Sequence, residues 1–417
     1  MQNELKIEAK AYLLKNKIQN YEWGTRGEDA VIPKLLGFEA EKDKPYAELW
    51  IGSHPKAPSS VVISGGKEVS LNELIERYPE EILGRDVSVK FEGRLPFLLK
   101  VLSASEALSI QAHPDKINAG ILHLKDPGNY PDSNHKPEIA IALDSLKALV
   151  GLKPLSEFIL AVKSYMGLRE FLGGGNSNEI LSSHLFLSSE ESISVRKLYE
   201  EMMKKSVLHP QELQGAVERV KGEILKKEKG QRSEEENLFL QLEKQYGSDV
   251  GLFSVFLFNL IELKEGEGIF LNAGIPHAYL KGNIIECMAN SDNVVRAGLT
   301  QKFKDIDSLL KILSFDLTPV EIINRSSSEK EELTYEVPAS EFRITRWKFS
   351  ERSTRTVDNY SVSILLIIEG NISLEINGAD KLFKQGDSIL IPWLVKELKI
   401  TFSSNCQVFR VSIPQNR

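Results

Sequence analysis

The sequence contains few cysteines and no long apolar segment. Only two of its 417 residues are cysteines, Cys287 and Cys406. Because they form no CxxC pair, the sequence predicts neither a thiolate metal site nor a redox motif, and so few cysteines fit a reducing compartment. The longest apolar runs, such as SILLII, are too short to span a bilayer, and the charged N-terminus lacks the apolar core of a signal peptide. We therefore expect a cytoplasmic protein that does not enter a membrane.

The chain also lacks an excess of positive charge. Its formal net charge is -7 and its pI is about 5.7, so no nucleic-acid partner is expected, although a local group of Lys and Arg could still bind one phosphate. The composition, 41% hydrophobic and 27% charged, is typical of a globular protein. The length indicates two or three domains.

The middle of the chain differs in character from its two ends. Residues 1–154 contain short apolar strands, such as LPFLLKVLS and EIAIAL, bounded by Gly, Pro, Asn and Asp. Residues 155–247 are charged and helix-periodic, with FLGGGNSN as a predicted loop. The predicted helical features are the stripe Leu213, Val217, Val220 and Ile224 and the capping box of Ser233 and Glu236.

Strand character returns from Val250, with VGLFSVFLFNLIEL, EGIFLNAGIPHAYL and NIIECMAN. Short strands with turns at regular intervals indicate a β-sandwich or jelly roll. The predicted fold is mainly β with a helical insertion. Residues 1–154 and 248–318 would form a discontinuous jelly-roll domain that carries the active site, residues 155–247 a helical domain, and residues 319–417 a second jelly roll.

Two segments of the chain resemble each other. KEGEGIFLNAGIPHAYL and KQGDSILIPWLVKEL each combine a Gly–acid turn, an apolar strand and a proline, which is the turn–strand rhythm of cupin barrels. The first copy follows its proline with His277 and the second with Trp393, and no histidine follows His277 in the chain. If the copies share a fold, the second has no histidine-based metal site.

Four polar residues stand at or beside predicted apolar strands. In LSIQAHPDK, Gln111 and His113 are two residues apart and share one face of a strand. Glu138 opens the strand EIAIAL, and His277 follows the turn AGIP. Two imidazoles, a carboxylate and an amide oxygen make a mixed N/O set that zinc accepts, and that iron(II) or manganese would also accept.

Further polar residues fall near the same strands. Ser109 is two before Gln111, Lys136 is two before Glu138, and Tyr279 is two after His277. Lys100 lies inside the apolar run FLLKVL and therefore needs a partner or a site. With Arg296, which closes NSDNVVRAGLT, these residues describe a pocket for an anionic, hydroxyl-rich ligand such as a sugar phosphate.

Other interpretations of these residues remain open at this point. A single buried histidine is more often a hydrogen-bonded structural residue than a ligand, and a lone Arg296 is more often a surface residue. Two histidines and a carboxylate also form the facial triad of iron(II) oxygenases, although a fourth ligand would fill a position that oxygen chemistry needs. A sugar-binding cupin without activity is the third alternative.

Long motifs, in order, resemble those of the type I phosphomannose isomerases. The motifs are NYEWG, PYAELWIGSHPKAPS, LPFLLKVLSASEALSIQAHPDK, NHKPEIAIAL and GIPHAYLKGNIIECMANSDNVVRAGLT, followed by the C-terminal cupin pattern. Motifs of this length are far more specific than a short pattern. The resemblance implies a cupin catalytic domain with one Zn²⁺ per chain, a helical insertion and a second jelly roll, in a monomer. It also implies interconversion of mannose 6-phosphate and fructose 6-phosphate, which supplies GDP-mannose synthesis or mannose catabolism.

The resemblance also implies roles for individual residues. The zinc ligands would be Gln111, His113, Glu138 and His277. Arg296 would be the catalytic arginine and Lys136 a candidate proton-transfer base, with zinc-bound water or a carboxylate as the alternative. Ser109 and Lys100 would hold the phosphate, and Glu48 and Tyr279 would line the pocket.

Overall fold

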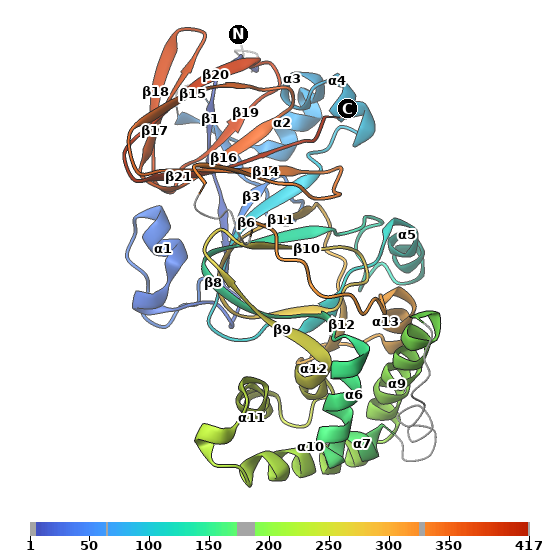
Figure 1. The fold of residues 1–417 in the computed structure, drawn as a ribbon. Helices are drawn as coiled ribbons and strands as arrows, with labels where there is room; N and C mark the ends of the chain where they lie inside the picture. The colour runs from blue at the N-terminus through green and yellow to red at the C-terminus, as the bar shows by residue number, and fades with distance from the viewer. Residues whose placement is uncertain (1–5, 64–65, 173–187, 325–329, 416–417) are drawn as a thin grey trace.

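A computed structural model describes residues 6–63, 66–172, 188–324 and 330–415 (Figure 1). Within these ranges the chain is mainly β with a block of helices, as expected. Every strand pair in the described part of the three sheets is antiparallel. No described helix is both long enough and apolar enough to cross a bilayer.

The nine-stranded sheet holds most of the predicted site residues. Its main path is β10 (Gly268–Leu271), β8 (Glu138–Leu152), β11 (His277–Ala289), β6 (Phe97–Ala104), β3 (Glu48–Gly52) and β2 (Lys17–Gln19). β7 (Ile110–Ala112) pairs with β11 and with β12 (Val295–Gly298), and β9 (Phe258–Lys264) pairs with β8.

The eight-stranded sheet joins the two ends of the chain. Its order is β13 (Glu332–Tyr335), β14 (Arg343–Phe349), β21 (Cys406–Ser412), β16 (Ser363–Glu369), β19 (Ser388–Ile391), β1 (Tyr12–Lys15), β4 (Ser60–Val62) and β5 (Glu68–Ser70). Tyr12 lies opposite Leu390, so N-terminal strands extend a sheet that is otherwise C-terminal. The sequence pattern gave no sign of this pairing, because strand partners distant in sequence leave no local signal.

A four-stranded sheet covers the other face of the eight-stranded sheet. It consists of β15 (Ser353–Asp358), β20 (Glu397–Phe402), β17 (Asn371–Ile376) and β18 (Ala379–Lys384). Trp347, Leu365 and Ile400 belong to the apolar cluster between these two sheets. A second cluster, with Leu99 and Ile285, packs the nine-stranded sheet against the eight-stranded one.

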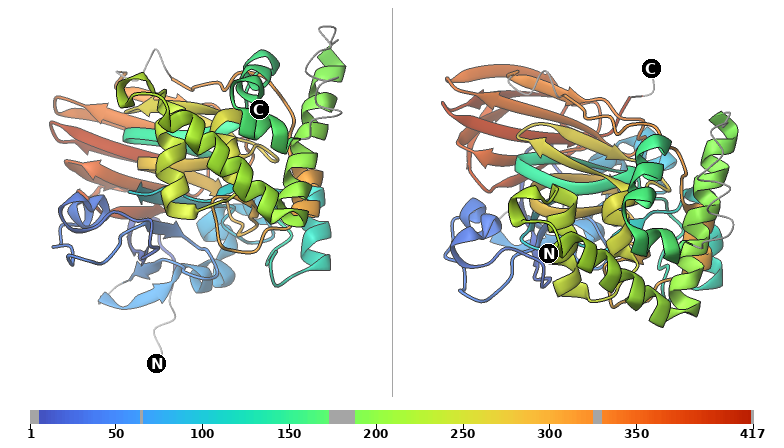
Figure 2. Two further views of the ribbon diagram at one scale, coloured as in Figure 1. Left: turned by 90° about the horizontal axis from the view of Figure 1, so that it is seen from below. Right: turned by 60° about the horizontal axis from the view of Figure 1, so that its bottom comes forward.

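The helical block lies beyond the nine-stranded sheet, at the bottom of Figure 1. It comprises α6 (Leu155–Ser164), α7 (Met166–Phe171), α9 (Ser188–Leu208), α10 (Pro210–Leu225), η3 (Lys229–Gln231), α11 (Glu234–Tyr246) and α12 (Gly251–Leu257). Seen from below, α10 and α11 lie in front of the strands (Figure 2). The remaining helices are η1 (Gly27–Asp29), α1 (Val31–Leu36), α2 (Leu71–Arg77), α3 (Pro79–Leu83), α4 (Arg85–Lys90), α5 (Lys116–Lys125) and α13 (Ile306–Ile312).

The local helix predictions are confirmed. The predicted stripe on α10 is buried along its whole length, and Ser233 and Glu236 form the capping box that starts α11. Most of the loop predicted over FLGGGNSN lies outside the described residues.

One strand prediction is wrong. The first half of VGLFSVFLFNLIEL is the helix α12, and only the second half, β9, is a strand. All seven residues of α12 are buried, so its apolar side chains surround the helix on every side. An apolar run without a polar face carries no periodicity that separates a helix from a strand.

The two similar segments adopt the same turns, but their prolines are not equivalent. The backbone N–H of Lys264 donates to Glu267 (2.9 Å), as that of Lys384 does to Asp387 (2.9 Å). The next turn is closed by Ile275 N–H to Asn272 O in one copy and by Val395 N–H to Pro392 O in the other. The matched positions are therefore 120 residues apart throughout. His277 corresponds to the exposed Glu397 and not to Trp393.

Candidate metal centre and active site

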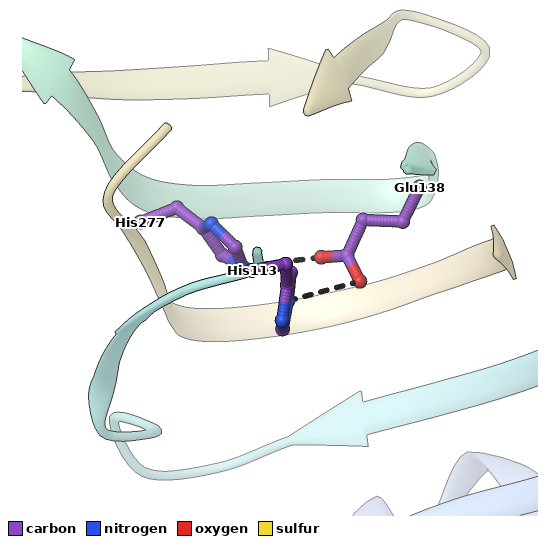
Figure 3. Close-up of side chains that lie close together, drawn as sticks. All are labelled: His113, Glu138 and His277. Atoms are coloured by element: carbon purple, nitrogen blue, oxygen red, sulfur yellow. Dashed lines mark ion pairs between the residues drawn. The ribbon is translucent and has the colours of Figure 1, made fainter. Parts of the chain in front are cut away.

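Three predicted ligands meet at the ends of neighbouring strands (Figure 3). His113 follows β7, Glu138 begins β8 and His277 begins β11. One donor atom from each lies within 4.8 Å of the others, and all three side chains are buried. Segments far apart in the sequence thus bring two imidazoles and a carboxylate to one point.

Backbone carbonyls fix the orientation of both imidazoles. His113 Nδ1 lies 2.8 Å from the carbonyl oxygen of Asn293, and His277 Nδ1 lies 3.0 Å from that of Ile275. Since a carbonyl can only accept, each Nδ1 carries the proton, and each Nε2 presents a lone pair. These Nε2 atoms face Glu138, at 3.4 Å from Oε2 for His113 and 3.1 Å from Oε1 for His277.

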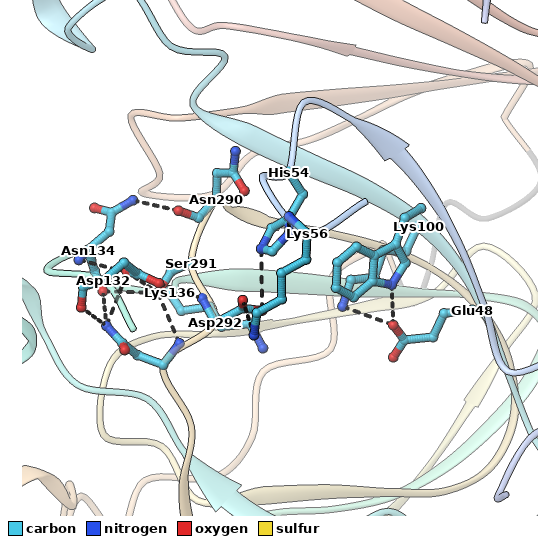
Figure 4. Close-up of polar contacts among 12 residues, drawn as sticks. Glu48, His54, Lys56, Lys100, Asp132, Asn134, Lys136, Asn290, Ser291 and Asp292 are labelled. Atoms are coloured by element: carbon cyan, nitrogen blue, oxygen red, sulfur yellow. Dashed lines mark hydrogen bonds and ion pairs between the residues drawn. The ribbon is translucent and has the colours of Figure 1, made fainter. Parts of the chain in front are cut away.

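A polar network surrounds Asn293, whose carbonyl holds His113; Figure 4 shows its members Asp132, Asn134 and Ser291. Asn293 Nδ2 donates to the carbonyls of Asp132 and Asn134, and Ser291 Oγ donates to Asp132 Oδ1 at 2.8 Å. Burial, together with the neighbouring Lys136 ammonium, lowers the pKa of His113 to about 4. The ring is therefore neutral at pH 7, which is the form that binds a metal.

The carboxylate of Glu138 has a neighbour on each of its oxygens. Its Oε1 accepts a hydrogen bond from Tyr279 Oη at 3.2 Å, and its buried Oε2 lies 3.1 Å from Lys136 Nζ and 3.4 Å from His113 Nε2. Burial alone would raise the pKa of Glu138, but Lys136 and His113 outweigh it and hold the pKa well below its usual range. An ionised carboxylate that faces two imidazole nitrogens with lone pairs fits a bound cation between them. The N, N, O donor set suits zinc, and also iron(II) or manganese.

Gln111, His277 and Arg296 form one row across three strands. Gln111 on β7 lies opposite His277 on β11 and opposite Arg296 on β12, so the three side chains point to the same face of the sheet. Gln111 Nε2 is 3.4 Å from His277 Nε2, and a half-turn of the amide would present its oxygen there instead. The half-buried Arg296 guanidinium makes no hydrogen bond or ion pair with another described residue, and burial lowers its pKa.

Lys136 lies directly beside the three ligands. Its Nζ is 3.1 Å from Glu138 Oε2 and 3.3 Å from His113 Nε2, and the side chain is buried. The residue lies in the segment that leads into β8. An amine that touches both a carboxylate and an imidazole is placed to exchange a proton with a molecule bound at this point.

Lys100 has the partners that its buried position required. Lys100 on β6 lies opposite Glu286 on β11 and Trp50 on β3. Its Nζ is 2.9 Å from Glu286 and 3.5 Å from Glu48, and Trp50 donates from Nε1 to Glu48. Burial acts to lower the pKa of Lys100, but the two carboxylates raise it above its ordinary value. Much of its charge is thus already compensated within the protein.

Sequence reasoning missed Glu286. Burial raises the pKa of Glu286 most strongly, with a further contribution from the charge of Glu138, and Lys100 opposes this shift. The available signal was the acid inside the apolar strand NIIECMAN, which is as unusual there as Lys100 is in FLLKVL. Sequence reasoning also missed Asp292, whose carboxylate lies 3.3 Å from His54 and 2.7 Å from Lys56.

The structure places the remaining predicted residues as follows. Tyr279 and Glu48 are buried and bound to charged residues of the site. Ser109 lies just before β7, is half-buried, and makes no side-chain hydrogen bond with another described residue. Its hydroxyl is therefore available to a ligand.

Comparisons with known proteins agree with this site. The model of the type I phosphomannose isomerase catalytic domain matches residues 12–155. The mannose-6-phosphate isomerase of Mus musculus is 36% identical over 94% of this chain and 96% of its own, and that of Saccharomyces cerevisiae is 37% identical over 88% and 90%.

Solved structures give the same result. A variant of phosphomannose isomerase from Salmonella typhimurium superposes with a TM-score of 0.83 at 29% identity, over 97% of this chain and 100% of that one. A mannose 6-phosphate isomerase bound with zinc and yttrium superposes with a TM-score of 0.81 at 29% identity and the same coverage. With relatives this similar over nearly its whole length, and with His113, Glu138 and His277 placed so that they could hold a metal ion, the chain belongs to the type I mannose-6-phosphate isomerase family.

Proposed function

We propose that the chain interconverts mannose 6-phosphate and fructose 6-phosphate at the centre formed by His113, Glu138 and His277. The observation that carries this function is the buried, pre-oriented ligand set in a chain that matches mannose-6-phosphate isomerases over most of its length. Its product would supply GDP-mannose synthesis, and the reverse reaction would serve mannose catabolism.

The metal of the proposal is one zinc ion, held by His113, Glu138, His277 and Gln111. Bound zinc acts as a Lewis acid that stabilises negative charge on a sugar oxygen, a contribution of several kcal/mol. A similar protein is bound with zinc, and the Nε2 lone pairs of His113 and His277 that face the Glu138 carboxylate support a cation here. Tyr279 and the carbonyls of Asn293 and Ile275 hold three of these ligands in place.

The reaction moves a proton between C2 and C1 of the open-chain sugar through an enediol. Lys136 is the proposed carrier, because its amine lies beside the metal ligands. A base within hydrogen-bond reach contributes roughly a hundredfold to ten-thousandfold in rate. Glu286 is the alternative carboxylate carrier, since burial favours its protonated form.

The remaining site residues would bind the substrate. Arg296 shares the face of Gln111 and His277 and forms no ion pair with another described residue, so it can stabilise charge that develops on the sugar. Ser109 and Lys100 are proposed to hold the phosphate, with Glu48 and Tyr279 against the sugar. Because Glu286 and Glu48 already compensate the charge of Lys100, other groups should contribute more to phosphate binding than Lys100 does.

The chain organisation is part of the proposal. Residues 1–154 and 248–318 would form the catalytic cupin domain, 155–247 a helical domain and 319–417 a second jelly roll. The repeated turn pattern 120 residues apart supports two related barrels. We further propose that the protein acts as a cytoplasmic monomer on a small sugar phosphate, with no nucleic-acid partner.

The test is conversion of fructose 6-phosphate by the purified, zinc-loaded chain, with mannose 6-phosphate measured by chromatography. Fructose without the phosphate should react far more slowly. Metal analysis of the active protein separates zinc from the iron of an oxygenase. Binding of fructose 6-phosphate without any mannose 6-phosphate would instead identify a sugar-binding protein and reject the isomerase.

A further inference from the structure

A second polar site lies inside the sandwich formed by the eight-stranded and four-stranded sheets. Side chains opposite each other in register share a face. Trp347 on β14 and Val408 on β21 lie opposite each other and belong to the apolar core of this sandwich. From the next row on the same face onward, the residues are no longer apolar.

The change of character is abrupt. The next row pairs Thr345 with Arg410, and the row after it pairs Arg343 with Ser412. Thr334 on β13 extends the first of these rows. By strand alternation these inward-facing positions should continue the core. A change from Trp and Val to Arg, Thr and Ser therefore needs an explanation other than packing.

A cavity of about 320 Å³ lies at this end of the sandwich. Its walls come from β13, β14 and β21 on one side and from β15 and the segment after it on the other, all near the top of Figure 1. The lining that matters for recognition is Thr334, Arg343, Thr345, Trp347, Arg355 and Arg410. We refer to this cavity as the arginine pocket.

Arg410 is held in place by two hydrogen bonds and forms no ion pair of its own with a described carboxylate. Its Nη2 donates to the carbonyl of Asp358 and to Asn359 Oδ1, both at 3.0 Å. Asn359 is itself fixed, because its Nδ2 donates to the carbonyls of Pro392 and Val395. Among the described residues, Arg410 forms no ion pair and its buried Nε has no hydrogen-bond partner.

The electrostatics of the pocket agree with this geometry. Burial, with a smaller contribution from the nearby Arg343, lowers the pKa of Arg410 to about 10, and the charges of Asp358 and Glu332 oppose this shift only in part. The indole N–H of Trp347 is also buried, without a hydrogen-bond partner among the described residues. Arg343 and Arg355 pair with surface carboxylates outside the cavity, Glu336 at 3.6 Å and Glu331 at 3.3 Å.

The donors and acceptors of the pocket define the class of ligand. Guanidinium groups bind phosphate or carboxylate oxygens through paired N–H donors. Glu332, Asp358 and several hydroxyls also line the cavity, and these groups accept hydrogen bonds from ligand hydroxyls. The volume is that of a small-molecule site.

We infer that the arginine pocket binds a small polyhydroxylated molecule through one phosphate or carboxylate group, at a site separate from the metal centre. Arg410 and Arg343 take the oxyanion, and the Thr and carboxylate side chains take the hydroxyls. This site does not depend on the isomerase activity proposed above.

The test measures binding to the zinc-loaded full chain by calorimetry with three matched probes: sorbitol 6-phosphate, gluconate and sorbitol. We expect a binding event at the arginine pocket for sorbitol 6-phosphate or gluconate and none for sorbitol. The stronger of the two identifies the oxyanion as phosphate or carboxylate. Binding at the pocket should alter the fluorescence of the wild-type protein, and Trp347→Phe should lose the part of the change that follows this event.

Variants of the pocket residues test whether the binding measured by calorimetry takes place at the arginine pocket. Arg410→Gln and Arg343→Gln should each weaken it roughly 10- to 100-fold, as for the loss of a charged hydrogen bond, with kcat for fructose 6-phosphate unchanged. Arg352→Gln, at an exposed arginine outside the pocket, is the matched control and should bind as the wild type does. Arg343 is exposed, so its variant keeps the test valid if Arg410→Gln fails to fold. Equal affinity in Arg343→Gln and wild type, or no binding event beyond the metal centre, overturns the proposal.

Discussion

The two turn–strand repeats, which begin at Lys264 and Lys384, have the same backbone turns but differ in the chemistry of their side chains. Gly266 and Gly386 occupy equivalent positions in the two turns, with φ of 78° and 85°. Each turn is closed by a backbone N–H that donates to an acidic side chain. Five residues after Asn272 one copy has the buried His277, and five residues after Pro392 the other has the exposed Glu397. Fold alone therefore does not make a metal centre.

The difference lies in what surrounds each repeat. Around His277, neighbouring strands supply Gln111 and Glu138, and carbonyls orient the imidazoles. Around the second repeat, the interior is apolar along most of its length and becomes basic only at the arginine pocket. One region is built for a cation and the other for an anion.

The largest effect should come from removing the charge of a ligand. Glu138→Gln keeps the shape of the side chain but loses the anionic oxygens, so kcat/KM should fall by about three orders of magnitude, since the metal contributes several kcal/mol. Coupled assays and metal analysis measure the loss. Glu397→Gln, at the position that matches His277 in the second repeat, should keep full activity. Equal activity of Glu138→Gln and Glu397→Gln would contradict the claim that the metal centre lies in the first repeat's region alone.

The next effect concerns the proton carrier. Lys136→Ala should lower kcat roughly a hundredfold to ten-thousandfold, while zinc content stays at one per chain. Lys381→Ala, at an exposed lysine of the second region, serves as the control. Near-normal kcat in Lys136→Ala would move the role to Glu286, and the variant Glu286→Gln would then be the one to lose turnover.

A smaller effect should follow from loosening a ligand. Tyr279→Phe removes the hydrogen bond to Glu138 Oε1, and loss of such a support costs roughly 10- to 100-fold in metal affinity. Competition with a chelator measures it. Tyr335→Phe removes a comparable buried hydrogen bond, from Tyr335 to the carbonyl of Gly266, and should leave zinc affinity unchanged. If both variants lose zinc equally, Tyr279 acts through general stability and not through Glu138.

The smallest effect separates stability from metal binding. Gly274 and Gly386 both have positive φ, and a Cβ at either would lie 2.4 Å from a backbone oxygen. Alanine at each position should reduce the free energy of unfolding by about 1–3 kcal/mol. Gly274 also donates its N–H to the carbonyl of His113, so only Gly274→Ala should also weaken zinc binding.

Chemical denaturation and zinc competition check this pair. Gly378→Ala is the control, because Gly378 has a similar φ of 77° and open space at the Cβ position. It should show only the cost of the backbone conformation. Unchanged zinc affinity in Gly274→Ala would mean that the loop before His277 does not position His113.

Local patterns predicted the features of the fold that local physics determines. The spacing of Gln111 and His113, the acid that opens β8 and the histidine that opens β11 are visible in sequence because polar residues beside apolar strands are unusual. Spacing alone could not show that His113, Glu138 and His277 converge, since their distance depends on strand pairings far apart in the chain. The long family motifs supplied that information.

The errors have equally physical causes. α12 is apolar on every face, so its periodicity is hidden. Aligning the two repeats by their prolines paired His277 with Trp393, which is wrong. The backbone hydrogen bonds of the turn set the correct alignment, and they pair His277 with Glu397. Glu286 was overlooked because its significance depends on Lys100 across the sheet.

The central claim is metal-dependent isomerisation at the His113, Glu138 and His277 centre. The most direct measurement is the rate of mannose 6-phosphate formation from fructose 6-phosphate before chelation, after chelation and after addition of zinc. We predict that activity disappears when the metal is removed and returns with one zinc per chain. Full activity in protein shown to contain no metal, or no activity with zinc fully bound, would contradict the account.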